Sequence, residues 1–155
     1  MSTRSMIGME MPDKTIKAIY CHFDGYLHGV GKVLNDHYTD PDKVEKLIEL
    51  GDLSVLGTWY DEGLSKMSWT RYDMDDVARK KYDALAEDMT ITYRSRGEDD
   101  VDAKTYKDLH DYQKAIQDTD CDYAYVFMTD YTGVYRWHYI PVPYFKPVDD
   151  ALEDE

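Results

Sequence analysis

Apolar and polar residues alternate with a period of two in several short stretches of the chain, which is the pattern of half-buried strands. Residues 15–23, TIKAIYCHF, have this pattern and predict a strand. Residues 90–95, TITYRS, have the same β-branched and aromatic character, whereas residues 53–59 suit either a short strand or a loop. Residues 122–142 alternate on both sides of a turn at 130–133, which predicts a β-hairpin.

Other segments have apolar residues three and four positions apart, the spacing of a helix with one buried face. The best defined helix covers residues 41–50, because Asp40 caps it, Pro41 occupies its first turn and Gly51 ends it. Three further helices are predicted, over residues 29–38, 74–89 and 104–118. The second of these is expected to bury a face made of Val77, Tyr82, Leu85 and Ala86.

The order of these elements predicts an α+β domain, with a mostly antiparallel sheet and helices packed on one side of it. A single domain is expected over residues 15–148, because no linker long enough to separate two domains interrupts the pattern. Residues 1–14 are polar and rich in Met and are predicted to form a flexible leader, and residues 60–73 an irregular segment. Residues 149–155 contain five acids and no base, so we expect an acidic tail.

Composition changes this picture mainly through charge and tyrosine content. The 155 residues include 32 acids and 18 bases, for a formal net charge of −14, and 15 tyrosines. Such a field repels phosphate backbones, so we expect no direct binding to nucleic acid, and it favours basic protein partners or divalent cations. The alternative is that the charge serves solubility alone.

Cysteine usage and hydropathy bear on the compartment. Cys21 and Cys121 stand 100 residues apart in the sequence, and no CxxC pair is present, which excludes a zinc ribbon. No signal peptide and no apolar run of roughly 20 residues is visible. We therefore expect a cytoplasmic protein with reduced thiols, without membrane contact and without a cofactor; its oligomeric state stays open.

The most distinctive stretch is YCHFDGY, residues 20–26, which places a thiol, an imidazole and a carboxylate at the end of the first predicted strand. In a strand, His22 and Asp24 face the same side, so the carboxylate is a candidate to orient the imidazole as a catalytic base. Cys21 faces the other side and is a candidate nucleophile. The structural alternative is that Cys21 fills a small buried space, Asp24 caps the turn and His22 is partly exposed.

Arg94 and Arg96 are expected on one side of a strand, where two guanidinium groups suit a phosphate or a carboxylate. Together with Tyr26 they form a candidate pocket for an anionic ligand. The alternative is that both arginines pair with neighbouring acids. The five histidines have neither HxH nor HExxH spacing, so no metal site is predicted.

Acids are concentrated in residues 98–122, which hold nine acids and three lysines. A row of carboxylates on a rigid surface can imitate the phosphate spacing of DNA and occupy the basic groove of a nucleic-acid-binding enzyme. The alternative is an ordinary solvated helix face. The candidate partner-binding residues are Asp99, Asp100, Asp108, Asp111 and Asp118.

The run IYCHFDGYLHGVGKVLNDHYTDPDKVEKLIELGDLSVLG resembles the opening of a family of small proteins found in phages, prophages and bacteria. Its members have a similar Tyr-Cys-His-aromatic-Asp-Gly-Tyr box, followed by a helix pair that ends in Leu-Gly-Asp. The similarity covers residues 16–57 and, more loosely, 90–145, whereas residues 60–88 depart from it. The resemblance implies a phage-linked intracellular protein and no particular activity, because the family is functionally uncharacterised.

Three functions follow as hypotheses. The first is a phage or prophage accessory protein in the cytoplasm of a host bacterium, which binds a host protein with a basic surface. That partner would be a nucleic-acid-handling defence enzyme, met through the acidic, Tyr-rich surface. The second is a binding protein or sponge for an anionic nucleotide. The third is a small hydrolase or transferase that uses His22 with Asp24, or Cys21.

Overall fold

The structure, a computed structural model, describes residues 2–140 and 146–153. The strands are β1 Ser5–Glu10, β2 Ile16–Cys21, β3 Leu53–Val55, β4 Ile91–Thr92, β5 Lys104–Tyr106, β6 Tyr123–Thr129, β7 Tyr135–Tyr139 and β8 Lys146–Pro147. The α-helices are α1 Lys32–His37, α2 Pro41–Glu49, α3 Glu62–Ser68, α4 Asp76–Leu85, α5 Leu109–Gln117 and α6 Val148–Glu153. Three short helices differ from the α-helix in winding: the π-helix η1 Leu27–Gly31, and the 3₁₀-helices η2 Arg71–Asp73 and η3 Arg94–Arg96.

The strands form one sheet in the order β4-β3-β2-β1-β6-β7-β8, with β5 beside β3 along the same edge of β2. The β1–β6 and β2–β3 pairs are parallel, and the other five pairs are antiparallel. The predicted α+β class with a mostly antiparallel sheet is therefore confirmed, and the sheet is mixed. None of the helices in the described part of the chain is both long enough and apolar enough to cross a membrane.

The prediction of a flexible leader over residues 1–14 is wrong, because β1 lies within this segment and forms a central strand of the sheet. Ile7 pairs with Ile19 of β2 on one side and with Tyr125 of β6 on the other. The side chains of β1 alternate between the two faces of the sheet, and both sets are buried. The short run MIGM contains a glycine and two flexible methionines, so its local pattern is weak, and its stability comes from the strands on either side.

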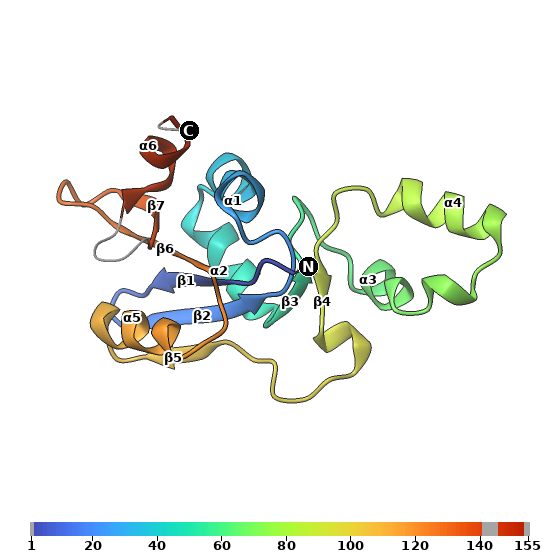
Figure 1. Cartoon of the computed structure of the whole chain (residues 1–155), viewed down its shortest axis with the longest axis horizontal. Helices are drawn as coiled ribbons and strands as arrows, with labels where there is room; N and C mark the ends of the chain where they lie inside the picture. Colours follow the sequence, from blue (N-terminus) through green and yellow to red (C-terminus); the bar gives the residue numbers. More distant parts are fainter. Residues whose placement is uncertain (1, 141–145, 154–155) are drawn as a thin grey trace.

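Helices cover both faces of the sheet, which differs from the expected arrangement on one side (Figure 1). The larger core lies between the sheet and η1, α1, α2 and α6. The smaller core lies on the opposite face, where α5 supplies Tyr112. Because β2 and β6 bury residues on both faces, their apolar runs are nearly continuous, as expected for central strands of a covered sheet.

A glycine in β1 permits the close approach of α5. A Cβ atom on Gly8 would lie 3.1 Å from the Tyr112 ring and 3.1 Å from Ile16. The fully buried Tyr112 donates a hydrogen bond from its hydroxyl to the carbonyl oxygen of Tyr125, at 3.0 Å. This contact joins α5 to the central strands.

Near the end of the chain, residues 148–153 form α6 in place of the predicted acidic tail. Val148 and Ala151 are buried in the larger core, and Asp149 pairs with Arg136 of β7 at 2.6 Å. The rest of that predicted tail, residues 154–155, lies outside the described residues. Val148, Ala151 and Leu152 have helical spacing, but the many acids of the segment led to the prediction of a solvated tail.

Several predicted elements differ in extent. Segment 60–73 is not irregular, because Asp61 caps α3 there. The strand predicted at 90–95 ends at Thr92 and is followed by η3. The helix predicted over 104–118 begins only at Leu109, because residues 104–106 pair with β2. The helix at α2 and the β6–β7 hairpin are confirmed.

Candidate functional site

His22 follows the last residue of β2 and is held between two hydroxyl groups. Its Nδ1 lies 2.6 Å from the hydroxyl of Tyr20, and its Nε2 lies 3.0 Å from the hydroxyl of Ser2. Burial raises the pKa of Tyr20 to about 12, so the phenol is neutral at physiological pH. Both ring nitrogens are thus engaged, and Asp24 is not the group that orients the imidazole. Asp24 instead adopts φ 58°, and its backbone carbonyl oxygen accepts the N–H of Val30 in η1.

Cys21 lies inside the larger core and is fully buried. Burial raises the pKa of its thiol to about 12, and the sulfur lies 3.6 Å from the carbonyl oxygen of Phe23. A nucleophilic cysteine needs an accessible thiolate. The structure provides neither access nor ionisation, so it assigns Cys21 to packing.

The two candidate anion-binding arginines do not share a strand face, because both belong to η3. Arg94 donates to the carbonyl oxygen of Glu49 at 2.9 Å and pairs with Asp102. Arg96 pairs with Glu98 at 2.7 Å, and its guanidinium lies 4.5 Å from the centre of the Trp69 ring. The alternative that both arginines pair with neighbouring acids is therefore confirmed.

Tyr26, the third member of that predicted pocket, is exposed just before η1. The cleft that contains Arg94 is lined by residues of α2, β1, β2 and β5, and neither Tyr26 nor His22 is among them. The structure therefore does not bring the predicted anion-binding groups together. Among the described residues, no group of three His, Cys, Asp or Glu side chains is placed to hold a metal ion.

The five acids proposed for partner binding are divided among separate places. Asp99 and Asp100 lie in the loop between η3 and β5. Asp108 caps α5 by accepting the N–H of Asp111 at 2.9 Å, and Asp118 follows the last residue of that helix. About 15 Å of helix therefore separates Asp108 from Asp118. A continuous row of carboxylates along 98–122 is not formed.

Much of the acidic content has a structural use elsewhere in the chain. An aspartate caps each of the helices α2, α3, α4 and α5 by accepting a backbone N–H. Each arginine of the chain also pairs with a carboxylate. Local neutralisation and capping therefore account for part of the charge, and the remaining excess is carried by exposed acids in loops and helix ends.

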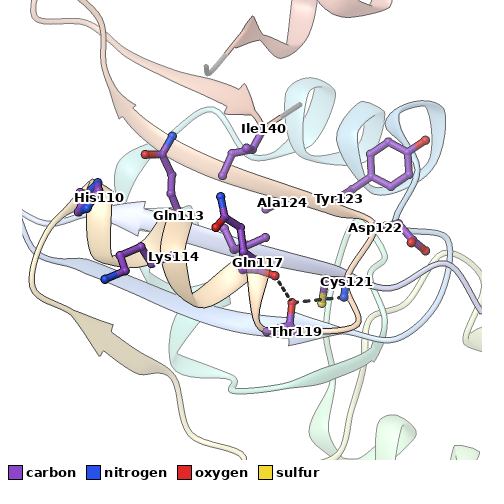
Figure 2. Close-up of a pocket in the computed structure, with 11 residues that line it drawn as sticks. His110, Gln113, Lys114, Gln117, Thr119, Cys121, Asp122, Tyr123, Ala124 and Ile140 are labelled. Carbon is purple, nitrogen blue, oxygen red and sulfur yellow. Dashed lines mark hydrogen bonds between the residues drawn. The ribbon is translucent and has the colours of Figure 1, made fainter. Parts of the chain in front are cut away.

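Two clefts lie beside α5 on the sheet face that this helix covers. One, of about 450 Å³, runs between α5 and β6, with Gln113 and Gln117 on the helix side and Ile140 opposite (Figure 2). The other, of about 350 Å³, lies beyond the C-terminal end of α5, and the two clefts share Thr119 and Cys121. The amides of Gln113 and Gln117 share the lining of the first cleft with apolar side chains such as Ile116 and Ile140, which suits a ligand with both polar and apolar parts.

The second cleft combines charged groups with tyrosine rings. It is lined by Arg4 and Lys104 as cations, by Asp52 and Asp120 as carboxylates, and by Tyr20 and Tyr106, and Arg4 pairs with Asp120 at 3.4 Å. Burial raises the pKa of Asp52, while one of its carboxylate oxygens accepts the backbone N–H of Tyr20 at 2.9 Å. This is a feature that sequence reasoning missed, since its members come from five separate segments.

A helical arm, defined here as residues 60–89, joins β3 to β4 and extends away from the sheet (Figure 1). It is braced internally: the guanidinium of Arg71 binds both carboxylate oxygens of Asp83, at 2.7 and 2.6 Å, and the Tyr82 hydroxyl donates to the carbonyl oxygen of Leu64. The Ser65 hydroxyl, at 2.8 Å from that of Ser95, connects α3 to the body. These contacts hold the helices of the arm in fixed positions relative to one another.

The face of α4 that was predicted to be buried is split between the interior of the arm and solvent. Tyr82 is buried against α3, whereas Val77 is 66% exposed and Leu85 is 64% exposed. At 100° per residue, Val77 and Ala86 lie on opposite sides of a helix, so one neighbouring helix cannot cover both. The wide angular spread of the four apolar positions is the sequence signal that could have indicated this exposure.

Comparisons of the chain with protein-family models, with curated proteins and with solved structures give no match. The resemblance of residues 16–57 to a phage-linked family therefore stays a prediction.

Proposed function

We propose that this protein acts by binding another protein through the helical arm, and that the partner presents a basic surface. The observation that carries the proposal is a braced arm that leaves large side chains in solvent, with Tyr72 87% exposed in addition to Val77 and Leu85. Large side chains on a rigid element lose little conformational entropy on binding, and tyrosine is enriched in interface cores. The net charge of −14 favours encounter with basic partners.

Nucleic-acid-handling enzymes are a class whose working surfaces are basic, so an antagonist of a host enzyme of this class is the specific form of the proposal. The acids of α5 do not support a DNA-like row, because Asp108 caps the helix and Asp118 lies at its other end. The proposal therefore places recognition on the arm, with the overall charge acting mainly on the rate of association.

The test measures binding of the full chain to a panel of purified basic nucleic-acid enzymes, at about 50 mM and about 300 mM salt. We expect at least one partner whose affinity falls as salt rises and falls by about tenfold in the variant Tyr72→Ala. Tyr131→Ala is the matched control, because Tyr131 is fully exposed at the distant β6–β7 turn. Equal loss in both variants, or no salt dependence, contradicts the proposal.

A second candidate function is binding of a small anionic molecule, such as a nucleotide, in the cleft of about 350 Å³. The observation in its favour is Lys104 in a cleft of ligand size that is also lined by the rings of Tyr20 and Tyr106, with Arg4 beside it in an ion pair with Asp120. A thermal-shift screen with nucleotides and signalling nucleotides tests it. Stabilisation by a bound compound should disappear in the variant Lys104→Ala. If no anionic compound stabilises the protein, this candidate function is wrong.

A further inference from the structure

We propose that the outer face of α4 is a docking surface for an amphipathic helix of a protein partner, and that this helix carries basic residues at both ends of its apolar stripe. The inference rests on the proposed function, because it names the surface and the partner chemistry for binding by the arm. It differs from that function in committing to one face of one helix.

The outer face of α4 consists of residues that project within an arc of about 100°. Val77, Ala84 and Leu85 provide an apolar stripe about two turns long, with Lys81 between them. All four are exposed, whereas Tyr82, which projects about 60° beyond Leu85 around the helix axis, is buried against α3. This is the pattern of a helix that packs on two sides, with one side occupied inside the arm and the other open.

Within residues 2–140 and 146–153, nothing covers this face. Figure 1 shows α4 on the part of the arm that lies away from the sheet and from α6. The cap at Asp75 and the Arg71–Asp83 ion pair hold the helix in place without a partner. The face is therefore preorganised for docking.

The charges along α4 and its flanks follow an acidic–basic–acidic order. Asp75 caps the helix, and the Arg71–Asp83 and Asp76–Arg79 ion pairs lie within the arm. The charged residues outside these contacts keep the same order along the chain: Asp73, then Lys80 and Lys81, then Glu87 and Asp88.

This order argues against a second copy of the chain as the occupant. Antiparallel pairing of two α4 helices would place acidic ends against acidic ends and basic centres together, and parallel pairing in register would do the same. Like charges placed opposite each other weaken association, whereas opposite charges select the partner. The complementary partner is a helix with basic ends, an acidic centre facing Lys81 and an apolar stripe.

The test uses the full chain and a synthetic amphipathic helix of about three heptads, with a leucine stripe, lysines at both ends and a central glutamate. A matched peptide has the charges reversed. Fluorescence anisotropy should show that the basic-ended peptide binds about tenfold more tightly than the reversed peptide. The double variant Val77→Gln, Leu85→Gln should lose about tenfold in affinity for the first peptide while its melting temperature is unchanged, because both positions are exposed.

The control variant is Val134→Gln, which removes an exposed apolar side chain from β6–β7, far from the arm. Equal binding of the two peptides, or unchanged binding in the double variant, overturns the inference. A wild-type dimer in sedimentation analysis that dissociates in the double variant also overturns it, because the face then belongs to a second copy. If Tyr72→Ala weakens binding to the enzyme partner and the double variant does not, the docking face on α4 is wrong and the proposed function stands. If neither variant weakens that binding, both the docking face and the proposed function are wrong.

Discussion

Asp52 shows how one residue can hold several segments at the start of a short strand. Its backbone N–H donates to Val101 at 2.7 Å, its carbonyl accepts from Tyr93, and its carboxylate accepts the N–H of Tyr20. Tyr20 lies between the parts of β2 that pair with β3 and β5. The carboxylate therefore satisfies a backbone donor where no strand does.

The pKa of Asp52 leads to a prediction about stability and pH. Burial raises this pKa above 3.8, so the folded state binds the proton more tightly than the unfolded state. The contribution of Asp52 to stability is therefore fully present at low pH and is lost as pH rises from 3.8 through the raised pKa. Asp52→Asn keeps the acceptor and removes the charge, so we expect it to be more stable than the wild type at pH 7 and equal to it at low pH.

Urea denaturation at a series of pH values measures this difference. The matched variant Asp52→Ala removes the acceptor of the Tyr20 N–H and should lose about 1–3 kcal/mol at pH 7. An Asn variant that is less stable than the wild type at neutral pH would show that the charge itself is stabilising.

The close packing around Gly8 leads to a second prediction about stability. Gly8→Ala should destabilise the fold by about 1–3 kcal/mol, because the added carbon would lie 3.1 Å from Tyr112 and Ile16 in a closed core. Gly63→Ala is the matched control: the new carbon would meet only Asp61 at 3.4 Å, and alanine favours the helix α3 by about 0.5–1 kcal/mol. Thermal unfolding of both variants checks the pair, and equal effects would contradict the packing role of Gly8.

Among the elements, the helices with local end signals were the easiest to predict. In α2, Asp40 accepts the N–H of Asp42, and Pro41 occupies the first turn, as the sequence indicated. The apolar face of α2 is buried as predicted, because a single partner, the sheet, covers it. In α4 the cap is equally local, but burial depends on α3, whose existence was not predicted.

The arm should open separately from the sheet if its cap is removed. Asp75 accepts the N–H of Ala78 at 2.8 Å, so Asp75→Ala should weaken α4 by about 0.5–2 kcal/mol, while Asp75→Ser keeps a cap. Amide hydrogen exchange should accelerate in α4 and stay unchanged in β1 and β6. Uniform acceleration over the whole chain would mean that arm and sheet unfold together.

At the scale of the whole molecule, β1 joins the two halves of the sheet. It pairs with β2 and with β6, so the two cores meet across it. Deletion of residues 2–11 should therefore abolish cooperative unfolding and the near-ultraviolet circular dichroism of the buried tyrosines. A flexible leader would give an unchanged melting temperature, and that result would contradict the central position of β1.

The candidate site could be predicted only in part, because its chemistry depends on distant partners. The sequence correctly placed His22 at the end of a strand, but its partners, Tyr20 and Ser2, follow from the path of the N-terminal segment. The sequence also allowed two roles for Arg94 and Arg96, and the nearby acids decided between them. The clefts beside α5 could not be predicted, because each is lined by several separate segments.

By itself, the sequence determined the α+β class, the hairpin, helix α2 with its cap and the acidic balance of the molecule. These features depend on residues a few positions apart, whose backbone preferences and hydrogen bonds are local. The tertiary structure alone decided that β1 is central, that α5 covers the second face and that the outer side of α4 stays exposed. Burial is a property of the neighbours that a segment meets, and in this chain some of those neighbours lie more than a hundred residues away along the sequence.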